Sequence, residues 1–344
     1  MLPGPNGLGK IWIRLMIRSG HRVTSESFES LTECWRHARC LLRWDCLFML
    51  PPWLETWWRE FGSDEELYLV AIREGEEILG VAPLFLKGAK AHFIGSPDVC
   101  DYSDFIVSPG REIDFFNSLL DELKERGTKD LDLKSLRPDS TTLIHLPGVA
   151  RGRGWRCSCE PEDTSLELYL PSTWEAYLEM LNQKQRHEVR RKLRRIGETG
   201  KPQFRVLEYP EAFADGMAIF LKMFRESRED KAAFMSPQRE SFFCSLVEAM
   251  ARVHLIRLGI LELSGTPIAA ILFFDYNNVV YLYNSGYDLH YPSLSAGLVS
   301  KILCIKDSIE RNKAKFDFLK GDEIYKHRLG GKPIPLYRCN VSIE

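Results

Sequence analysis

The sequence predicts a mixed α/β fold, with an α+β mixed sheet, built from two similar lobes in tandem. The chain has 344 residues, which is long for a single hydrophobic core. Helix-like and strand-like segments follow the same order in both halves. Residues 75–85 resemble 264–274, and 127–133 resemble 312–319. We therefore expect a duplicated unit, with a loose extension over residues 1–22, an N-terminal lobe over 23–170 and a C-terminal lobe over 171–344.

The elements of the first half are predicted from two kinds of spacing. Apolar residues that recur every three or four positions indicate helices, and alternation of apolar with polar residues indicates strands. A double proline at 51–52 starts the second helix, because proline is favoured in the first helical turn. The expected helices are 28–43, 53–61, 112–126 and 140–144, and the expected strands are 67–73, 78–86, 91–94, 104–107, 129–133, 155–159 and 165–170.

The second half begins near Pro171. Residues 172–175 form a capping-box pattern, and one helix is expected from there to Ile196, where two nearby glycines end it. Further helices begin at residues 210, 236 and 295, the last reaching 311. The expected strands are 203–209, 255–263, 268–276, 279–287, 316–319 and 335–341.

Composition excludes several classes of protein. Apolar residues make up 44% of the chain and charged residues 27%, as in globular proteins. The formal charge of −2 gives no global reason to expect nucleic acid or an anionic membrane as a partner. The apolar runs at 11–17 and 41–58 are short or interrupted by charges, so we expect no membrane insertion. Nine scattered cysteines do not resemble a disulfide framework, which favours a cytoplasmic location.

A metal site is considered at Cys34, His37 and Cys40, whose spacing is even. No second ligand pair follows at the spacing of a zinc site, and the run has a helical pattern. Buried structural cysteine is the commoner explanation, and we expect no metal.

Chemistry-bearing residues concentrate between 279 and 326. An aromatic-rich strand is followed by the first turn of a helix near residue 295, and then by the strand 316–319. Gly321 ends that strand, and ionisable side chains follow it at once. A strand, a helix N-terminus and a second strand commonly hold a phosphate-bearing ligand beside a catalytic group.

The segment 184–195 is the most basic in the chain. Arg186, Arg190 and Arg194 share one helical face, which either binds a phosphate, a nucleotide-linked substrate or RNA, or is simply a solvated surface. No aromatic residues are interleaved with these arginines, so nucleic acid is not favoured as a partner.

Several motifs carry a family resemblance along most of the chain. In the first half they are PWLETWW (52–58), GVAPL (80–84), IGS (94–96) and DYSDF (101–105); in the second half they are Arg186 with its basic helix, IAA (268–270), YD (287–288), DFLKG (317–321) and YK (325–326). With the order of the elements, they resemble the CelD/BcsL group of GNAT-like proteins, which are cellulose biosynthesis-associated acetyltransferases related to the FemAB peptidoglycan transferases.

This resemblance implies two tandem GNAT-like lobes, acetyl-CoA or another acyl-CoA as donor, and activity in the C-terminal lobe. The residues placed at the cofactor are Leu294, Ser295, Ala296, Gly297, Leu298 and Lys301. The chain departs from its relatives here. It has Leu-Ser-Ala-Gly at 294–297 where they have a Ser-Pro-Gly type turn, and the glycine-rich pyrophosphate loop of typical GNAT enzymes is absent.

Acyl transfer from a thioester needs a base for the nucleophile, donors of hydrogen bonds to the oxyanion and a proton for the thiolate. Asp317 is the first candidate for the base or for a substrate-orienting carboxylate, Glu323 is the second, and Tyr325 or Tyr283 is expected to protonate the thiolate. The expected substrate-binding residues are Tyr281, Tyr283, Tyr287, Lys326 and Arg190. Alternatively, Asp317 is a structural ion-pair partner and the strand tyrosines belong to the core.

The leading hypothesis is an acyltransferase that moves an acetyl or other acyl group from acyl-CoA to an amine or hydroxyl. The resemblance suggests a small-molecule or saccharide acceptor, such as an exopolysaccharide precursor. One alternative is Fem-like transfer from aminoacyl-tRNA, which only the basic helix supports. Another is a catalytically inactive binding protein of the same fold, which the altered turn at 294–297 keeps open.

Overall fold

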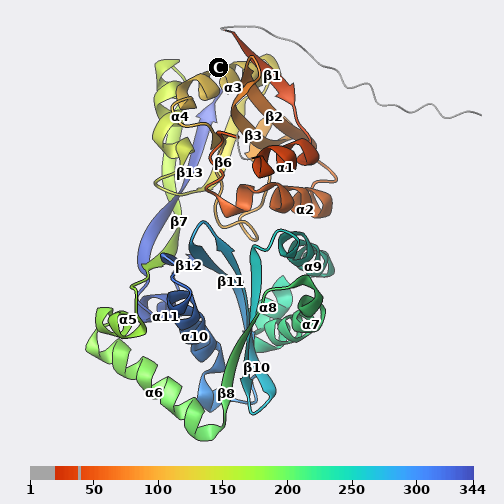
Figure 1. Cartoon of the computed structure of the whole chain (residues 1–344). Helices are drawn as coiled ribbons and strands as arrows, with labels where there is room; N and C mark the ends of the chain where they lie inside the picture. The colour runs from red at the N-terminus through yellow and green to blue at the C-terminus, as the bar shows by residue number, and fades with distance from the viewer. Residues whose placement is uncertain (1–19, 38–39) are drawn as a thin grey trace, which may run out of the picture.

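The computed structural model describes residues 20–37 and 40–344, and it contains two lobes that share one thirteen-stranded sheet (Figure 1). The strands follow the order β1-β2-β3-β4-β6-β13-β7-β12-β11-β10-β9-β8, and the short β5 pairs with β3 off this path. Strands β1 to β6 belong to one lobe and strands β8 to β12 to the other. The predicted mixed α/β class is confirmed.

The N-terminal lobe is a twisted sheet covered by four helices. Its strands are β1 (His21–Ser25), β2 (Glu66–Glu74), β3 (Glu77–Lys87), β4 (Lys90–Phe93), β5 (Ile106–Val107) and β6 (Asp130–Leu136). Its helices are α1 (Phe28–Arg36), the 3₁₀ turn η1 (Leu47–Met49), α2 (Pro51–Phe61), α3 (Glu112–Glu125) and α4 (Thr141–Gly152).

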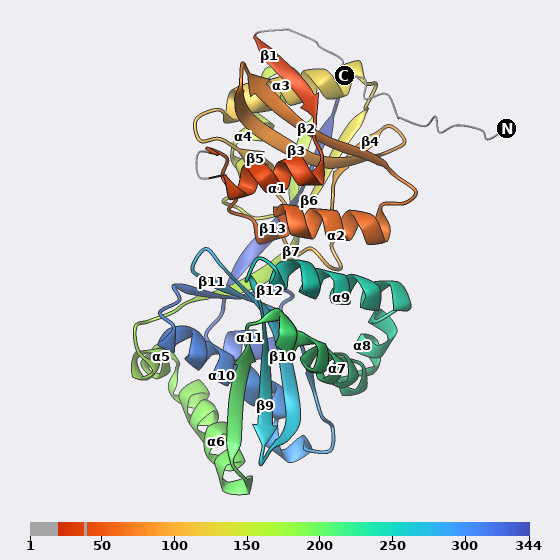
Figure 2. The same ribbon diagram turned by 45° about the vertical axis from the view of Figure 1, so that its right-hand side comes forward.

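The C-terminal lobe, which is the lower one in Figure 2, repeats this plan. Its strands are β8 (Pro202–Leu207), β9 (Ile256–Leu263), β10 (Thr266–Tyr276), β11 (Val279–Tyr287) and β12 (Lys315–Lys320). Its helices are α5 (Trp174–Met180), α6 (Gln183–Thr199), α7 (Pro210–Ser227), α8 (Glu229–Phe234), α9 (Pro237–Ala251), the 3₁₀ turn η2 (Pro292–Leu294), α10 (Ala296–Glu310) and α11 (Ile324–Arg328).

The strand order shows the duplication directly. The series β1, β2, β3, β4, β6 corresponds to β8, β9, β10, β11, β12, and each series ends in a parallel pair, β4 with β6 and β11 with β12. A helix precedes the last strand of each series, α3 in one lobe and α10 in the other.

The final strand of each unit lies partly in the opposite lobe. β7 (Cys157–Tyr169) follows the N-terminal lobe but pairs with β12, and β13 (Lys332–Ser342) follows the C-terminal lobe but pairs with β6. β7 and β13 also pair with each other along most of their length and cross between the lobes in Figure 1. The expected boundary at residue 171 stays a prediction. Because of this exchange, neither lobe's part of the sheet is built from one continuous stretch of sequence.

Several expected elements differ from the structure. The helix expected over 174–196 is two helices, because Asn182 starts α6 with its own capping box and Leu181 is extended. The helix expected over 28–43 ends at Arg36. The two strands expected at 155–159 and 165–170 are the single strand β7, which accommodates Pro161 opposite an irregular register at Leu336 and Tyr337.

Helix α2 joins the two lobes through an apolar interface. Trp53 is fully buried, and its ring lies 5.1 Å from that of Phe274 and 5.4 Å from that of Tyr283, both in the C-terminal lobe. Phe242 of α9 lies 6.5 Å away on another side of the same ring. Large aromatic groups contribute most to such cores, so this contact holds the lobes together near the strands that the sequence singled out.

A disulfide joins Cys159 of β7 to Cys339 of β13, which are direct partners in the strand pairing. The expectation that the cysteines form no disulfide framework therefore needs one qualification, because these two residues are brought together only by pairing of strands far apart in sequence. Within residues 20–37 and 40–344, no helix combines the length and the apolar character that crossing a bilayer requires.

Candidate active site

The candidate site lies where two parallel strands separate. β11 and β12 pair at Val279 with Lys315, at Val280 with Phe316 and at Tyr281 with Asp317, and the pairing ends there. Beyond this point, residues of both strands line a cavity of about 740 Å³, which we call the donor slot. Where two strands separate, the N–H and C=O groups on their facing edges no longer bond to each other. These groups are therefore available to bind a ligand.

The first turn of α10 lines the donor slot. Helix α10 begins after Ser295, which has φ 53° and makes no side-chain cap. The N–H groups of Leu298 and Val299 donate to the Ser295 carbonyl oxygen, which leaves those of Ala296 and Gly297 at the open end of the helix. A Cβ atom on Gly297 would come within 2.6 Å of the Tyr287 ring, so glycine allows this ring to cover the turn. The Lys192 ammonium of α6 lies 2.5 Å from Ser295 Oγ. Free N–H groups, the helix dipole and a lysine together suit an anion.

Lys301 is buried inside the donor slot, one turn further along α10. Its ammonium donates to Ser285 Oγ and to the Gly297 carbonyl oxygen, each at 2.9 Å, and lies 5.0 Å from the centre of the Tyr325 ring. Burial lowers the pKa of Lys301 to about 7, and the neighbouring charge of Lys231 acts in the same direction. Burial also raises the pKa of Tyr325, which keeps its hydroxyl protonated at neutral pH.

The end of β12 is held in a strained conformation. Leu319 has φ 60°, which is rare for a residue with a branched side chain, and the pairing with β7 is irregular between Asp317 and Lys320. The buried Lys326 ammonium donates to the carbonyl oxygens of Leu319, Lys320 and Gly321 at 3.0, 2.6 and 2.9 Å. Lys326 therefore stabilises the turn that forms one wall of the donor slot.

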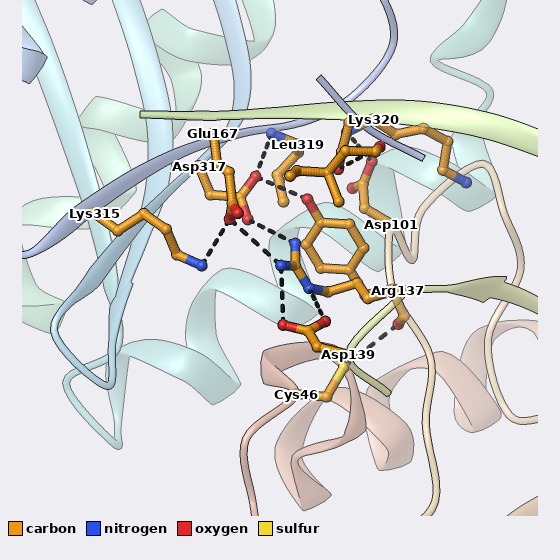
Figure 3. Close-up of polar contacts among 12 residues, drawn as sticks. Cys46, Asp101, Arg137, Asp139, Glu167, Lys315, Asp317, Leu319 and Lys320 are labelled. Carbon is orange, nitrogen blue, oxygen red and sulfur yellow. Dashed lines mark hydrogen bonds and ion pairs between the residues drawn. The ribbon is translucent and has the colours of Figure 1, made fainter. Parts of the chain in front are cut away.

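Asp317 lies beside the donor slot rather than in it, and Figure 3 shows its contacts. Its Oδ1 accepts hydrogen bonds from the Tyr102 hydroxyl and the Leu319 N–H, each at 2.8 Å. Its Oδ2 lies 3.9 Å from Arg137 Nη1. Burial raises the pKa of Asp317 to about 6, while the Arg137 charge and the Tyr102 hydrogen bond oppose that rise.

The surroundings of Arg137 extend this network (Figure 3). Its Nε donates to Asp139 at 3.0 Å, its Nη2 lies 3.5 Å from Glu167, and its guanidinium lies 5.2 Å from the centre of the Tyr102 ring. Glu167 is paired with Lys315 at 2.7 Å. The carboxylates and cations of both lobes therefore alternate around Asp317.

The loop at residues 95–104 reaches from the N-terminal lobe into the gap between β11 and β12. The Tyr283 hydroxyl donates to the Val99 carbonyl oxygen at 2.9 Å, and the Lys320 N–H donates to Asp101 at 3.1 Å. Burial raises the pKa of Asp101. Because this loop contacts both separating strands, the N-terminal lobe completes the site.

The structure brings most of the predicted site residues together. The donor slot is lined by Ser295, Ala296, Gly297, Leu298, Lys301, Tyr283, Tyr287, Glu323, Tyr325 and Lys326. Leu294, which was also expected at the cofactor, is instead buried in the hydrophobic core and does not line the slot. Tyr281 and Asp317 line a neighbouring cavity instead. Arg190 is exposed on α6 and is not among the residues that line either cavity. The assignment of roles to these residues stays a prediction.

Several residues of the site were not expected from the sequence, and three of them stand out. Tyr102 and Arg137 contact Asp317 from the N-terminal lobe, and Lys231 of α8 donates to the Ser285 carbonyl oxygen in the donor slot. The available signal was the motif at 101–105, to which no role was assigned. Its Asp104 caps the start of α4 by accepting from the N–H groups of Thr141 and Thr142.

Three sulfur atoms of Cys157, Cys159 and Cys339 lie within 4.8 Å of one another, on the two exchanged strands. Two of these residues form the disulfide, and none of the three lines the donor slot. The Cys34 and Cys40 sulfur atoms lie 2.7 Å apart near α1.

Most residues of the donor slot belong to a segment that matches a known domain. Residues 183–327 match a family model described as an acetyltransferase (GNAT) domain. No curated protein matches the chain. Solved structures share the fold at low sequence identity. FemX is 12% identical, with a TM-score of 0.60 over 92% of this chain and 96% of that one.

Two further structures are similar over most of the chain. A protein of unknown function from Bacteroides thetaiotaomicron is 10% identical, with a TM-score of 0.57 over 93% of this chain and 99% of that one. The C-terminal domain of a proposed lysylphosphatidylglycerol synthetase from Agrobacterium fabrum is 10% identical, with a TM-score of 0.56 over 84% and 86%. These likenesses support the fold, and the domain match indicates that residues 183–327 form an acetyltransferase domain of the GNAT type.

Proposed function

We propose that the protein transfers an acetyl or other acyl group from acyl-CoA, bound in the donor slot, to an amine or hydroxyl acceptor. The observation that carries this proposal is the separation of β11 and β12 around a cavity of about 740 Å³ that the first turn of α10 also lines. The resemblance noted in the sequence adds the finer part of the proposal, a saccharide acceptor such as an exopolysaccharide precursor.

The residues of the donor slot fit an anionic donor at one end. The N–H groups at the start of α10 suit the pyrophosphate, while the Tyr287 ring packs over Gly297. Lys192, which does not itself line the slot, adds a positive charge beside Ser295. Charges over the rest of the slot are balanced, since Arg228 pairs with Asp230 and Lys326 pairs with Glu323. When bound, the donor supplies an activated thioester carbonyl.

The side chains around the slot have separate roles in this proposal. Asp317 takes the proton of the attacking group, because its Oδ2 has no hydrogen-bond partner within the described residues. Tyr325 gives a proton to the departing thiolate, and the Lys301 side chain lies beside it, 5.0 Å from the centre of its ring. Glu323 is the second candidate for the base, but its side chain is half exposed and is paired with Lys326.

Binding of acetyl-CoA tests the proposal without knowledge of the acceptor. Saturating acetyl-CoA should raise the melting temperature, because a ligand at a hundred times its Kd stabilises a protein by about 2.7 kcal/mol. Leu298→Glu should abolish this shift. A carboxylate in the first turn favours the helix itself but repels a phosphate.

Leu303→Glu is the matched control, because Leu303 is also half-buried on α10 but does not line the slot. It should keep the full shift. A wild-type protein that shows no shift, or an equal shift in both variants, would contradict a donor site at α10.

A second candidate function is transfer from an aminoacyl-tRNA, favoured by the basic helix α6. Arg190, Arg194 and Arg195 are exposed on this helix, although Arg194 is paired with Glu198. Salt-dependent tRNA binding that is lost when Arg190, Arg191 and Arg194 are changed to glutamate would support this candidate. Acetyl-CoA binding with no tRNA binding would exclude it.

A further inference from the structure

A second cavity, of about 340 Å³, lies between the lobes, and we call it the interlobe cavity. Trp44, Tyr102 and Arg137 line it from the N-terminal lobe, and Tyr281 and Asp317 line it from the C-terminal lobe. It is lined by β11 and β12 where these strands are still paired, whereas the donor slot is lined by the residues that follow. The two cavities therefore succeed one another along the same two strands.

Three residues that line the interlobe cavity carry a buried polar atom without a hydrogen-bond partner within the described part of the chain. These atoms are Asp317 Oδ2, Arg137 Nη1 and Trp44 Nε1, and the first two lie close together. The Asp317 side chain is only 1% exposed. Buried polar atoms of this kind are rare, because each costs about 1–3 kcal/mol when it is left unsatisfied.

The separation of Asp317 Oδ2 and Arg137 Nη1 indicates what would satisfy them. They are 3.9 Å apart, which is too far for a direct hydrogen bond. Asp317 Oδ1 is already held by Tyr102 and Leu319, and the other guanidinium nitrogens of Arg137 face Asp139 and Glu167. A group between them would donate to Asp317 and accept from Arg137. A hydroxyl does both, and so do a neutral amine and a water molecule.

The walls of the interlobe cavity restrict the rest of the ligand. The rings of Trp44, Tyr102 and Tyr281 offer apolar faces, and Asp139 and Lys315 offer hydrogen bonds at the rim. A volume of about 340 Å³ lies at the lower end of the range of about 300–1,000 Å³ that is typical of small-molecule sites. This combination of flat apolar faces with hydrogen-bonding side chains suits a compact, hydroxyl-rich molecule.

We propose that the interlobe cavity is the acceptor subsite, and that it receives a hydroxyl-rich molecule of monosaccharide size whose attacking hydroxyl or amino group lies between Asp317 Oδ2 and Arg137 Nη1. This proposal rests on the proposed function, because it assigns the second substrate of the same reaction. It also assigns Arg137 and Tyr102 of the N-terminal lobe to substrate recognition.

The assignment is consistent with a balanced transfer step. The attacking oxygen or nitrogen loses its proton to Asp317 Oδ2 and forms the bond to the acyl carbon. The bond from that carbon to sulfur breaks, and the thiolate takes the Tyr325 proton. Asp317 and Leu319 are two residues apart on β12, so the proton acceptor adjoins the wall of the donor slot.

Binding of glucosamine, measured by saturation-transfer NMR in the absence of donor, tests the subsite. Val279 lines the interlobe cavity, so Val279→Phe should fill it and weaken glucosamine binding. Asp317→Asn, which is nearly isosteric, should weaken binding about tenfold, because a hydrogen bond to a charged group contributes about 1.5–3 kcal/mol. Val23→Phe is the control, at a partly buried strand position outside the cavity, and should bind normally.

Acetyl-CoA shifts, measured on the same proteins, separate the two proposals. Normal acetyl-CoA shifts in both cavity variants, with weakened glucosamine binding, support the subsite. Glucosamine binding that is unchanged in Val279→Phe and Asp317→Asn overturns it, and so does the absence of glucosamine binding to the wild-type protein. If acetyl-CoA does not shift the melting temperature of the wild-type protein, the proposed function is contradicted. In that case, glucosamine binding that is lost in the two cavity variants but not in Val23→Phe would still support a ligand site between the lobes.

Discussion

Asp317→Asn should make the protein more stable at pH 8 and less active at the same time. The pKa of the buried Asp317 is raised from 3.8 to about 6, so its charged form is disfavoured in the folded protein. A carboxyl group whose pKa is raised by folding stabilises the folded protein at a pH below its pKa in the unfolded chain. This stabilisation is lost as the pH rises through the folded-state pKa of about 6. Above that pH the folded protein carries a buried negative charge, and the cost of its desolvation lowers the free energy of unfolding.

The size of this effect follows from the shift. About two pKa units correspond to at most about 3 kcal/mol, and asparagine removes this cost while its side-chain oxygen can still accept from Tyr102 and Leu319. An entropy of unfolding of about 2.1 cal/mol/K per residue over 344 residues converts 3 kcal/mol into about 4 °C. We therefore expect a melting temperature up to about 4 °C higher at pH 8, and no gain at pH 4.

Activity should change in the opposite direction. If Asp317 is the base, turnover of an acceptor rises with pH through about 6 in the wild-type protein. Asn should remove this limb and lower turnover about a hundredfold or more. Scanning calorimetry at both pH values and a pH–rate profile measure the two effects. A variant that is destabilised at pH 8 would refute the burial argument. A variant that keeps its activity and the rise of turnover with pH would refute the catalytic role.

Two further changes test the packing of the fold. Cys339→Ala removes the disulfide to Cys159 and should lower the free energy of unfolding by about 2–4 kcal/mol under non-reducing conditions. If the variant and the wild-type protein are equally stable without reductant, the disulfide does not form. Trp53→Ala should cost about 3–5 kcal/mol in urea unfolding and also weaken acetyl-CoA binding, because the ring supports Tyr283. Trp58→Ala, at a partly buried position on the same helix, should cost less, and an equal loss would argue against the interlobe contact.

Local patterns in the sequence were sufficient to predict the mixed α/β fold, the repeated order of elements and the strand–helix–strand region at 279–326. These features depend on the spacing of apolar residues that are close together in the sequence, such as the alternation in β12 and the helical period of α10. For the same reason the candidates around Ser295, Lys301 and Tyr325 were chosen together, and the structure places them in one slot.

Contacts between distant residues were decided only by the tertiary structure. Tyr102 and Asp317 are 215 positions apart, and Cys159 and Cys339 are 180 apart, so no local period connects them. The exchange of β7 and β13 between the lobes depends on which sheet edge each strand meets, and edge pairing does not leave a local signature. The sequence by itself therefore determined the unit and its reactive segment, whereas the packing of one unit against the other decided where Asp317 lies and what surrounds it.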